Sequence, residues 1–255
     1  MTDDWAEIAD TFVDKHYRSL HGRVRLYVIE QHLASHLPGP PAAIVDVGGG
    51  AGNQSIPLAR RGYRVTIVDS SPSMLERAER VLASQPPEVA ARVTLVEAAG
   101  EDAPGVLDER FDAVLCHGVV PYLSDPSGML DALAGLARPH GLVSIVGKSQ
   151  AGLVVRPALD GRWREALSQF GAEGEINRLG RQTRADSIET LTDRMRLIGV
   201  ELIEWYGVRL FTDGWVEEDI DEDEVSDVQA VELEASRRDP YRQLSRLFHW
   251  VGQRI

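Results

Sequence analysis

Cysteine and lysine are almost absent from this chain of 255 residues. The single cysteine, Cys116, excludes an internal disulfide framework and a zinc site built from several cysteines, and we expect no metal site. Lys15 and Lys148 are the only lysines, so arginine carries nearly all the positive charge. No apolar run approaches the roughly 20 residues of a membrane-spanning helix. The first residues are acidic and polar, unlike a signal peptide, so we expect a cytoplasmic protein without a membrane partner.

Positive charge is scarce overall, since the formal net charge is −13. This balance argues against broad, non-specific binding of nucleic acids. Ten of the acids lie between residues 217 and 234, a stretch without lysine or arginine, so the rest of the chain is close to neutral. A local basic surface is therefore compatible with the composition. The acidic stretch itself is typical of a solvated helix face.

Short apolar runs alternate with amphipathic segments between residues 43 and 148. Strands that alternate with helices form a parallel sheet through right-handed crossovers, which predicts an α/β fold. Ser71 and Pro72 have the residue types of a helix cap and a first helical turn. The predicted strands are residues 43–47, 63–69, 92–98, 111–118 and 142–148, and the predicted helices between them include 54–61 and 126–137.

The flanking regions have different patterns. Helical spacing of apolar residues predicts helices at 4–19 and 22–36, whereas 150–182 contains helix-like pieces and no clear strand. A helix at 187–197, a strand at 201–211 and a last strand at 244–255 predict an antiparallel hairpin at the sheet edge. We therefore expect a single domain, divided into an N-terminal helical lid (1–40), a cofactor-binding core (41–148), a cap insertion (149–185) and a C-terminal helix with the edge hairpin (186–255).

The stretch "IVDVGGGAGNQS" joins the first predicted strand to its helix. Gly48, Gly50 and Gly52 alternate, and such glycines let a ligand approach the backbone closely. A dinucleotide fingerprint would have the spacing G-x-G-x-x-G, whose third glycine is missing here. Asp46, two residues before the loop, would repel a pyrophosphate and attract an ammonium group. A ligand with an amino-acid end fits these residues better than NAD.

Further cofactor contacts are expected where the next two strands end. An acid at Asp69 is suited to bind both ribose hydroxyls. In "EAAGED", Gly100 would contact adenine through its backbone and Asp102 would accept from the amino group, while Met74 or Leu75 covers the ring. An adenosine joined to an amino acid through a sulfonium is S-adenosylmethionine. The predicted cofactor residues from this reasoning are Asp46, Gly48, Gly49, Gly50, Asp69, Ser70, Met74, Gly100, Glu101 and Asp102.

With these motifs, residues 43–148 resemble the class I S-adenosylmethionine-dependent methyltransferases. The whole chain is similar to the bacterial tRNA 5-carboxymethoxyuridine methyltransferase family through "VDVGGGAGNQS", "HGVVPYLSDP", "GVRLFTD", "FVDKHYRSLHGRVR" and "ELEASRRDPYRQLSRLFHW". The resemblance implies a seven-stranded, Rossmann-like mixed sheet with an antiparallel last strand and helices on both faces. It also implies that Arg25 and His117 contact the cofactor, and that the reaction esterifies a carboxylate on the wobble uridine of tRNA. The chain departs from the family at Pro121-Tyr122 and at Thr212.

The acceptor determines which catalytic groups are needed. A carboxylate is ionised at neutral pH and needs no general base, but it needs cations to hold it, which makes Arg209 and Lys148 candidates. A phenol or hydroxyl acceptor would instead use His117 as base. Tyr122 would stack on an aromatic acceptor or pack in the core. Candidate contacts to tRNA phosphates are Arg178, Arg181 and Arg184.

Alternatives stay open at this point. The acceptor is either tRNA or a small metabolite or natural product, and a non-catalytic protein that binds S-adenosylmethionine is a further alternative. A nicotinamide dehydrogenase is disfavoured by the glycine spacing. The sequence is also compatible with a homodimer.

Overall fold

The computed structural model describes residues 19–177, 180–214 and 222–255. Residues 4–18 of the predicted helix at 4–19, Arg178 and residues 217–221 of the acidic stretch lie outside these residues. Within them, no helix is both long enough and apolar enough to cross a membrane.

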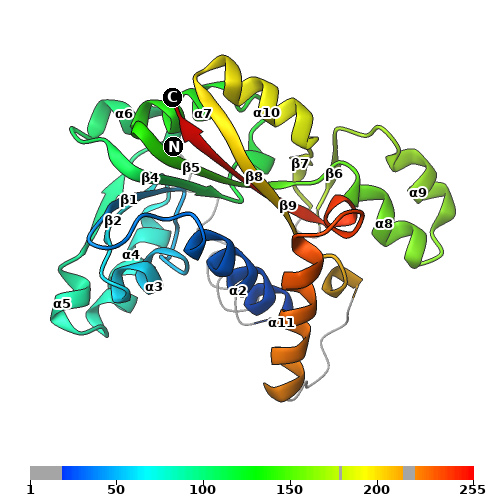
Figure 1. The fold of residues 1–255 in the computed structure, drawn as a ribbon, viewed down its shortest axis with the longest axis horizontal. Helices are drawn as coiled ribbons and strands as arrows, with labels where there is room; N and C mark the ends of the chain where they lie inside the picture. Colours follow the sequence, from blue (N-terminus) through cyan, green and yellow to red (C-terminus); the bar gives the residue numbers. More distant parts are fainter. Residues whose placement is uncertain (1–18, 178–179, 215–221) are drawn as a thin grey trace.

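A seven-stranded sheet forms the centre of the molecule (Figure 1). Its order is β3-β2-β1-β4-β5-β9-β8, with β9 antiparallel to both of its neighbours and the other six strands parallel to one another. This confirms the predicted mixed sheet and the antiparallel hairpin at its edge. The strands are β1 (Ala43–Val47), β2 (Arg64–Asp69), β3 (Val93–Glu97), β4 (Phe111–His117), β5 (Ala137–Lys148), β8 (Val200–Val208) and β9 (Leu247–Arg254).

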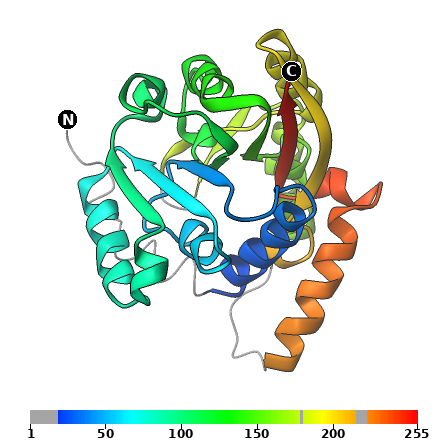
Figure 2. The same ribbon diagram turned by 60° about the vertical axis from the view of Figure 1, so that its left-hand side comes forward.

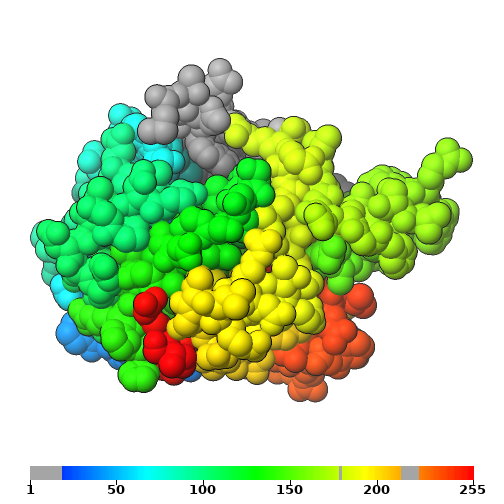
Figure 3. All heavy atoms as spheres, turned by 90° about the horizontal axis from the view of Figure 1, so that it is seen from above, coloured from blue at the N-terminus to red at the C-terminus, as the bar shows by residue number. Residues whose placement is uncertain are grey.

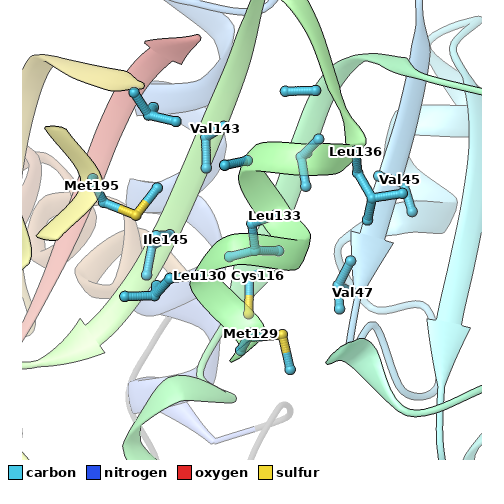
Figure 4. Close-up of a cluster of buried hydrophobic side chains, with 14 of the residues drawn as sticks. Val45, Val47, Cys116, Met129, Leu130, Leu133, Leu136, Val143, Ile145 and Met195 are labelled. Atoms are coloured by element: carbon cyan, nitrogen blue, oxygen red, sulfur yellow. The ribbon is translucent and has the colours of Figure 1, made fainter. Parts of the chain in front are cut away.

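Helices cover both faces of the sheet, and each face has its own hydrophobic core. Because side chains alternate along a strand, Val45 packs into one core and its neighbour Ile44 into the other. Figure 4 shows the first core, where Val143 of β5 and Leu133 of α7 lie among the labelled side chains. Cys116 is fully buried there, and burial raises the pKa of its thiol, as expected for an inert cysteine. The helices on this face are α6 (Ala103–Val106), α7 (Ser127–Leu136) and α10 (Ile188–Leu197).

The opposite face is covered by α2 and α11, which lie side by side (Figure 2), together with shorter helices. Helix α11 contains part of the acidic stretch. Its Asp227 and Glu234 are exposed as predicted, but Glu232 is buried. The prediction of a solvated face is therefore wrong for Glu232, whose partners are described below. The helices here are α2 (Leu20–Ala34), α3 (Ser55–Arg60), α4 (Pro72–Ala83), α5 (Pro87–Ala90) and α11 (Glu222–Ser236).

The cap segment, residues 149–185, projects from the sheet beyond the ends of β5 and β8 (Figures 1 and 3). It contains α8 (Gly152–Leu159) and α9 (Trp163–Gln169), followed by an antiparallel pair, β6 (Gly174–Ile176) and β7 (Gln182–Arg184). The expectation of no strand in this segment was wrong. Two strands of three residues are too short to show an alternating pattern, and their pairing with each other stabilises them.

The structure also corrects the residues at which three predicted strands begin or end. Strand β5 begins at Ala137, five residues early, because Ala137 pairs with Phe111 before a register shift in β4. Strand β8 ends at Val208 because the next residue, Arg209, has a left-handed φ of 62°. Strand β9 begins only at Leu247, since the preceding residues form a 3₁₀ turn (Tyr241–Leu244).

Candidate active site

A cavity of about 1330 Å³ opens at the carboxyl ends of the parallel strands. Ligands bind at this end in open α/β sheets because the loops of neighbouring strands diverge there. One half of the cavity is lined by the glycine loop and by the ends of β2 and β3. The other half is lined by the end of β5, the start of β9 and the cap segment.

The glycine loop leaves its side of the cavity free of side chains. Gly48 and Gly50 have positive φ values of 74° and 54°, which other residues adopt only with strain. A Cβ on Gly49 would lie 2.8 Å from Asp46 Oδ2, and one on Gly50 would lie 2.9 Å from Met74 Cε. These positions can therefore pack this closely only when they are glycine, and their backbone forms a cradle at the start of α3.

The two acids predicted to grip the cofactor have different surroundings. Asp69 lines the cavity, and its carboxylate accepts hydrogen bonds from Gly50 N at 2.8 Å and Ser71 N at 2.9 Å. Asp46 lies beneath the loop outside the cavity lining and accepts from Ser55 Oγ at 2.6 Å. Burial raises the pKa of Asp46 to about 6. Asp69 is thus positioned for direct contact, whereas Asp46 is positioned to support the loop.

The remaining predicted cofactor residues divide in the same way. Gly100 and Glu101 line the cavity at a short 3₁₀ turn after β3, but Asp102 is exposed and does not line it. Of the two candidates to cover the adenine, Met74 lines the cavity, and Leu75 packs into the core beneath. Ser70 also lines the cavity beside Asp69.

Arg25 and His117 meet at the end of β4. The Arg25 guanidinium, 8% exposed, donates to the His117 carbonyl at 3.2 Å, and both side chains line the cavity. Arg25 Nε and His117 Nδ1 are buried and have no hydrogen-bond partner among the described residues. Burial, with help from His249 and Arg25, lowers the pKa of His117 well below its ordinary value. The imidazole is therefore neutral near pH 7.

The other half of the cavity contains a cluster of ion pairs. Lys148 donates to Glu175 at 2.8 Å, and Arg246 also pairs with Glu175. Arg209 pairs with Asp213, which lies 3.8 Å from Arg246 as well. Burial lowers the pKa of Lys148, and all five side chains line the cavity. Three cations thus share two carboxylates, which leaves an excess of positive charge in this cluster.

The predicted substrate residues are not all brought together. Tyr122 lines the cavity, half-buried, and accepts from Asn177 Nδ2 of the cap segment at 3.3 Å. Arg181 also lines it, but Arg184 instead pairs with Asp186 at 2.6 Å and lines a separate cavity of about 400 Å³. Arg184 therefore lies outside the main cavity, in a neighbouring one that shares Tyr122 with it.

Sequence reasoning missed Glu175, Asp213 and Arg246 as site residues. Asp213 and Arg246 lie within the stretches "GVRLFTD" and "ELEASRRDPYRQLSRLFHW", but nothing in these stretches marks them as lining a cavity, and Glu175 belongs to a segment without a recognisable motif. It also missed Glu232 of α11, which accepts four hydrogen bonds from residues 210–212. These donors are the backbone N–H groups of Leu210, Phe211 and Thr212 and the Thr212 hydroxyl, at 2.8–2.9 Å. Glu232 thereby fixes the loop that begins at Arg209. A single buried acid among the exposed acids of this helix has no signal in the sequence alone.

The buried histidines give the first prediction. Burial lowers the pKa of His32 to about 2 and of His249 to about 3. Below about pH 6.5 these histidines are protonated in the unfolded chain but stay neutral in the folded chain. The stability that depends on their neutral form is therefore fully present above pH 6.5 and is lost as the pH falls. For His249 the loss amounts to about 2 kcal/mol between pH 8 and pH 5. His249→Gln should therefore lower the free energy of unfolding, measured with urea, by about 2 kcal/mol less at pH 5 than at pH 8.

The matched control is His140→Asn, which also removes an imidazole and tolerates the left-handed φ of 63° at this exposed position. As a surface substitution, it should change the unfolding free energy by no more than about 0.5 kcal/mol. An equal penalty of His249→Gln at pH 5 and pH 8 would contradict the prediction.

Known proteins resemble the chain both in part and along its whole length. Residues 45–145 match the methyltransferase domain family. The tRNA 5-carboxymethoxyuridine methyltransferase of Escherichia coli (strain K12) is 27% identical over 97% of this chain and 95% of its own. The ubiquinone biosynthesis O-methyltransferase of Xanthomonas campestris pv. campestris (strain B100) is 33% identical over 43% of this chain and 44% of its own.

Among solved structures, magnesium protoporphyrin IX methyltransferase from Synechocystis PCC 6803 with bound SAH superposes with a TM-score of 0.63 at 16% identity. The superposition covers 99% of this chain and 97% of that one, so the two share a fold. A methyltransferase domain, methyltransferase relatives and a glycine-lined cavity at the carboxyl ends of the strands agree with one another. The chain is an S-adenosylmethionine-dependent methyltransferase.

Proposed function

We propose that this methyltransferase esterifies the carboxylate of 5-carboxymethoxyuridine at the wobble position of tRNA. The observation that carries the proposal is the extent of the similarity to the Escherichia coli tRNA enzyme, which spans 97% of the chain and includes the cap segment and edge hairpin that line the second half of the cavity. The similarity to the ubiquinone enzyme is restricted to 43% of the chain. A shared cofactor domain accounts for that shorter match.

The cofactor half of the cavity fits S-adenosylmethionine. We infer that Asp69 binds the ribose hydroxyls and that the backbone at Gly100 and Glu101 contacts adenine. We also infer that the Arg25 guanidinium, which lines the cavity, binds the carboxylate of the amino-acid end. When bound, the cofactor supplies a methyl carbon that is already activated by the positive sulfur. The protein therefore has to supply alignment of the acceptor more than chemical activation.

The other half of the cavity suits an anionic acceptor. A carboxylate needs no base, and charge-assisted hydrogen bonds from guanidinium groups hold its two oxygens in a fixed plane. Lys148, Arg209 and Arg246 supply the cations, and Glu175 and Asp213 hold them in place without neutralising them fully. Arg209 is our leading contact to the acceptor. Arg181 at the cavity wall is our candidate for a tRNA phosphate contact.

The proposal predicts that the purified protein, given S-adenosylmethionine and tRNA containing 5-carboxymethoxyuridine, forms the methyl ester. Mass spectrometry of the digested nucleosides would detect a product one methylene heavier. Arg209→Gln removes a charge-assisted hydrogen bond, which should lower kcat/KM for the tRNA by about 10- to 100-fold, that is about 1.5–3 kcal/mol.

The matched control is Arg196→Gln, an exposed arginine on α10 that does not line the cavity and should leave kcat/KM unchanged. Unmodified tRNA, which lacks the carboxylate, should not accept the methyl group. Methylation of a small phenol or hydroxyl compound, with none on the tRNA, would overturn the proposal in favour of a metabolite enzyme.

A further inference from the structure

Five buried or half-buried side chains form an unbroken hydrogen-bonded chain from the cavity wall to helix α11. His117 Nε2 lies 2.8 Å from Ser144 Oγ, which lies 2.7 Å from His249 Nε2. His249 Nδ1 lies 3.2 Å from His32 Nδ1, and His32 Nε2 lies 2.8 Å from Ser236 Oγ. The members come from β4, β5, β9, α2 and α11. Four of them, all but His117, are at most 2% exposed.

The far end of the chain determines the direction of its hydrogen bonds. Ser236 Oγ donates to the carbonyl of Leu233 at 2.6 Å. A hydroxyl has a single hydrogen, so Ser236 must accept from His32, whose proton is then on Nε2. A neutral His32 has a bare Nδ1, which accepts from His249. His249 therefore carries its proton on Nδ1.

The same reasoning continues to the cavity. Because His249 Nε2 is bare, the Ser144 hydroxyl donates to it and accepts from His117. His117 then carries its proton on Nε2, and its Nδ1 has only a lone pair. The buried Nδ1 has no partner among the described residues, which agrees with this result, since a buried N–H without an acceptor would be costly.

We propose that Ser144, His249, His32 and Ser236 are positioning residues that hold His117 at the cavity wall as the neutral Nε2–H tautomer. The proposal does not depend on the identity of the acceptor. It has a consequence for the site, because a neutral imidazole brings no positive charge to the cavity wall. An anionic group in the cavity must therefore be held by arginine or lysine.

The packing of the helices supports this role. Tyr206 of β8 stacks on His32 with the ring centroids 3.9 Å apart and an interplanar angle of 12°. The Tyr206 hydroxyl lies 2.7 Å from His36 Nε2, so a residue that is not one of the five hydrogen-bonded side chains holds the tyrosine ring in place. Stacking fixes the plane of His32, and the plane fixes where its two nitrogens point. The chain thereby links the α2–α11 helix pair of Figure 2 to the imidazole of His117.

Long-range ¹H–¹⁵N spectra of the uniformly labelled protein test the proposal without using the reaction, since they distinguish protonated from bare imidazole nitrogens. The His117 signals are identified by their loss in His117→Gln. The wild-type protein at pH 7.5 should show His117 with a protonated Nε2 and a bare Nδ1. A protonated Nδ1, or a charged ring, would overturn the proposal whatever the substrate proves to be.

Variants test whether the chain is responsible. Ser236→Ala removes the hydroxyl farthest from the cavity, and it should shift the His117 nitrogen signals toward a mixture of tautomers. Ser236→Thr keeps a hydroxyl and should restore the wild-type pattern, whereas loss of packing alone would not be rescued. If Ser236→Ala does not fold, as judged by circular dichroism, Ser144→Ala replaces it. Unchanged His117 signals in a folded alanine variant would disprove the positioning role.

Discussion

Asp69→Ala is expected to raise the Kd of S-adenosylmethionine at least about 100-fold, because it removes an ionised acceptor for the two ribose hydroxyls. Hydrogen bonds to charged groups contribute about 1.5–3 kcal/mol each, and about 1.4 kcal/mol corresponds to a factor of ten. The carboxylate also orders the cradle, since it accepts from Gly50 N and Ser71 N. Isothermal titration with S-adenosylmethionine and S-adenosylhomocysteine measures the effect.

Glu97→Ala is the matched control, because Glu97 lies directly opposite Asp69 in the β2–β3 register and is exposed outside the cavity. It makes the same change in charge at almost the same place, so its Kd should equal that of the wild type. Asp69→Asn keeps the shape of the side chain and separates loss of charge from loss of packing. Wild-type affinity in a folded Asp69→Ala protein would refute our assignment of the ribose contact.

Glu232→Gln is expected to destabilise the protein by about 3 kcal/mol and to lower its methyltransferase activity. The carboxylate accepts four hydrogen bonds, three at Oε1 and one at Oε2. The amide can keep only those at one oxygen, so at least the Leu210 N–H faces an amide NH₂ group that cannot accept from it. The loop that these bonds fix begins at Arg209, so a looser loop moves our leading acceptor contact. Urea unfolding and the tRNA methylation assay measure the two effects.

Glu234→Gln tests the specificity of this result, because Glu234 lies two residues away on the same helix and is exposed beside Arg238. Surface substitutions of this kind usually change the unfolding free energy by no more than about 0.5 kcal/mol. An effect of Glu232→Gln as small as that of Glu234→Gln would contradict the assignment of Glu232 as the anchor of the loop.

The cofactor half of the site was predictable because its signals are local. The segment from Ile44 to Asp69 contains a strand, a glycine turn, a helix and a second strand in direct succession, and the backbone follows that order. The Ser71 cap was confirmed for the same reason, since its side chain accepts from Met74 N, only three residues away. Asp46 shows the limit, because nothing in the sequence distinguished an acid in the cavity from one beneath the loop.

The sequence by itself determined the α/β class, the succession of strands and helices in the cofactor half and the class of cofactor, because glycine conformation and strand periodicity act over a few residues. Only the tertiary structure decided that Arg209 pairs with Asp213, that Arg184 lies outside the main cavity and that Glu232 is buried. It alone joined His32 to His249, which are 217 residues apart. Such contacts depend on which faces of distant elements meet, and that is settled by packing of the whole core rather than by any local pattern.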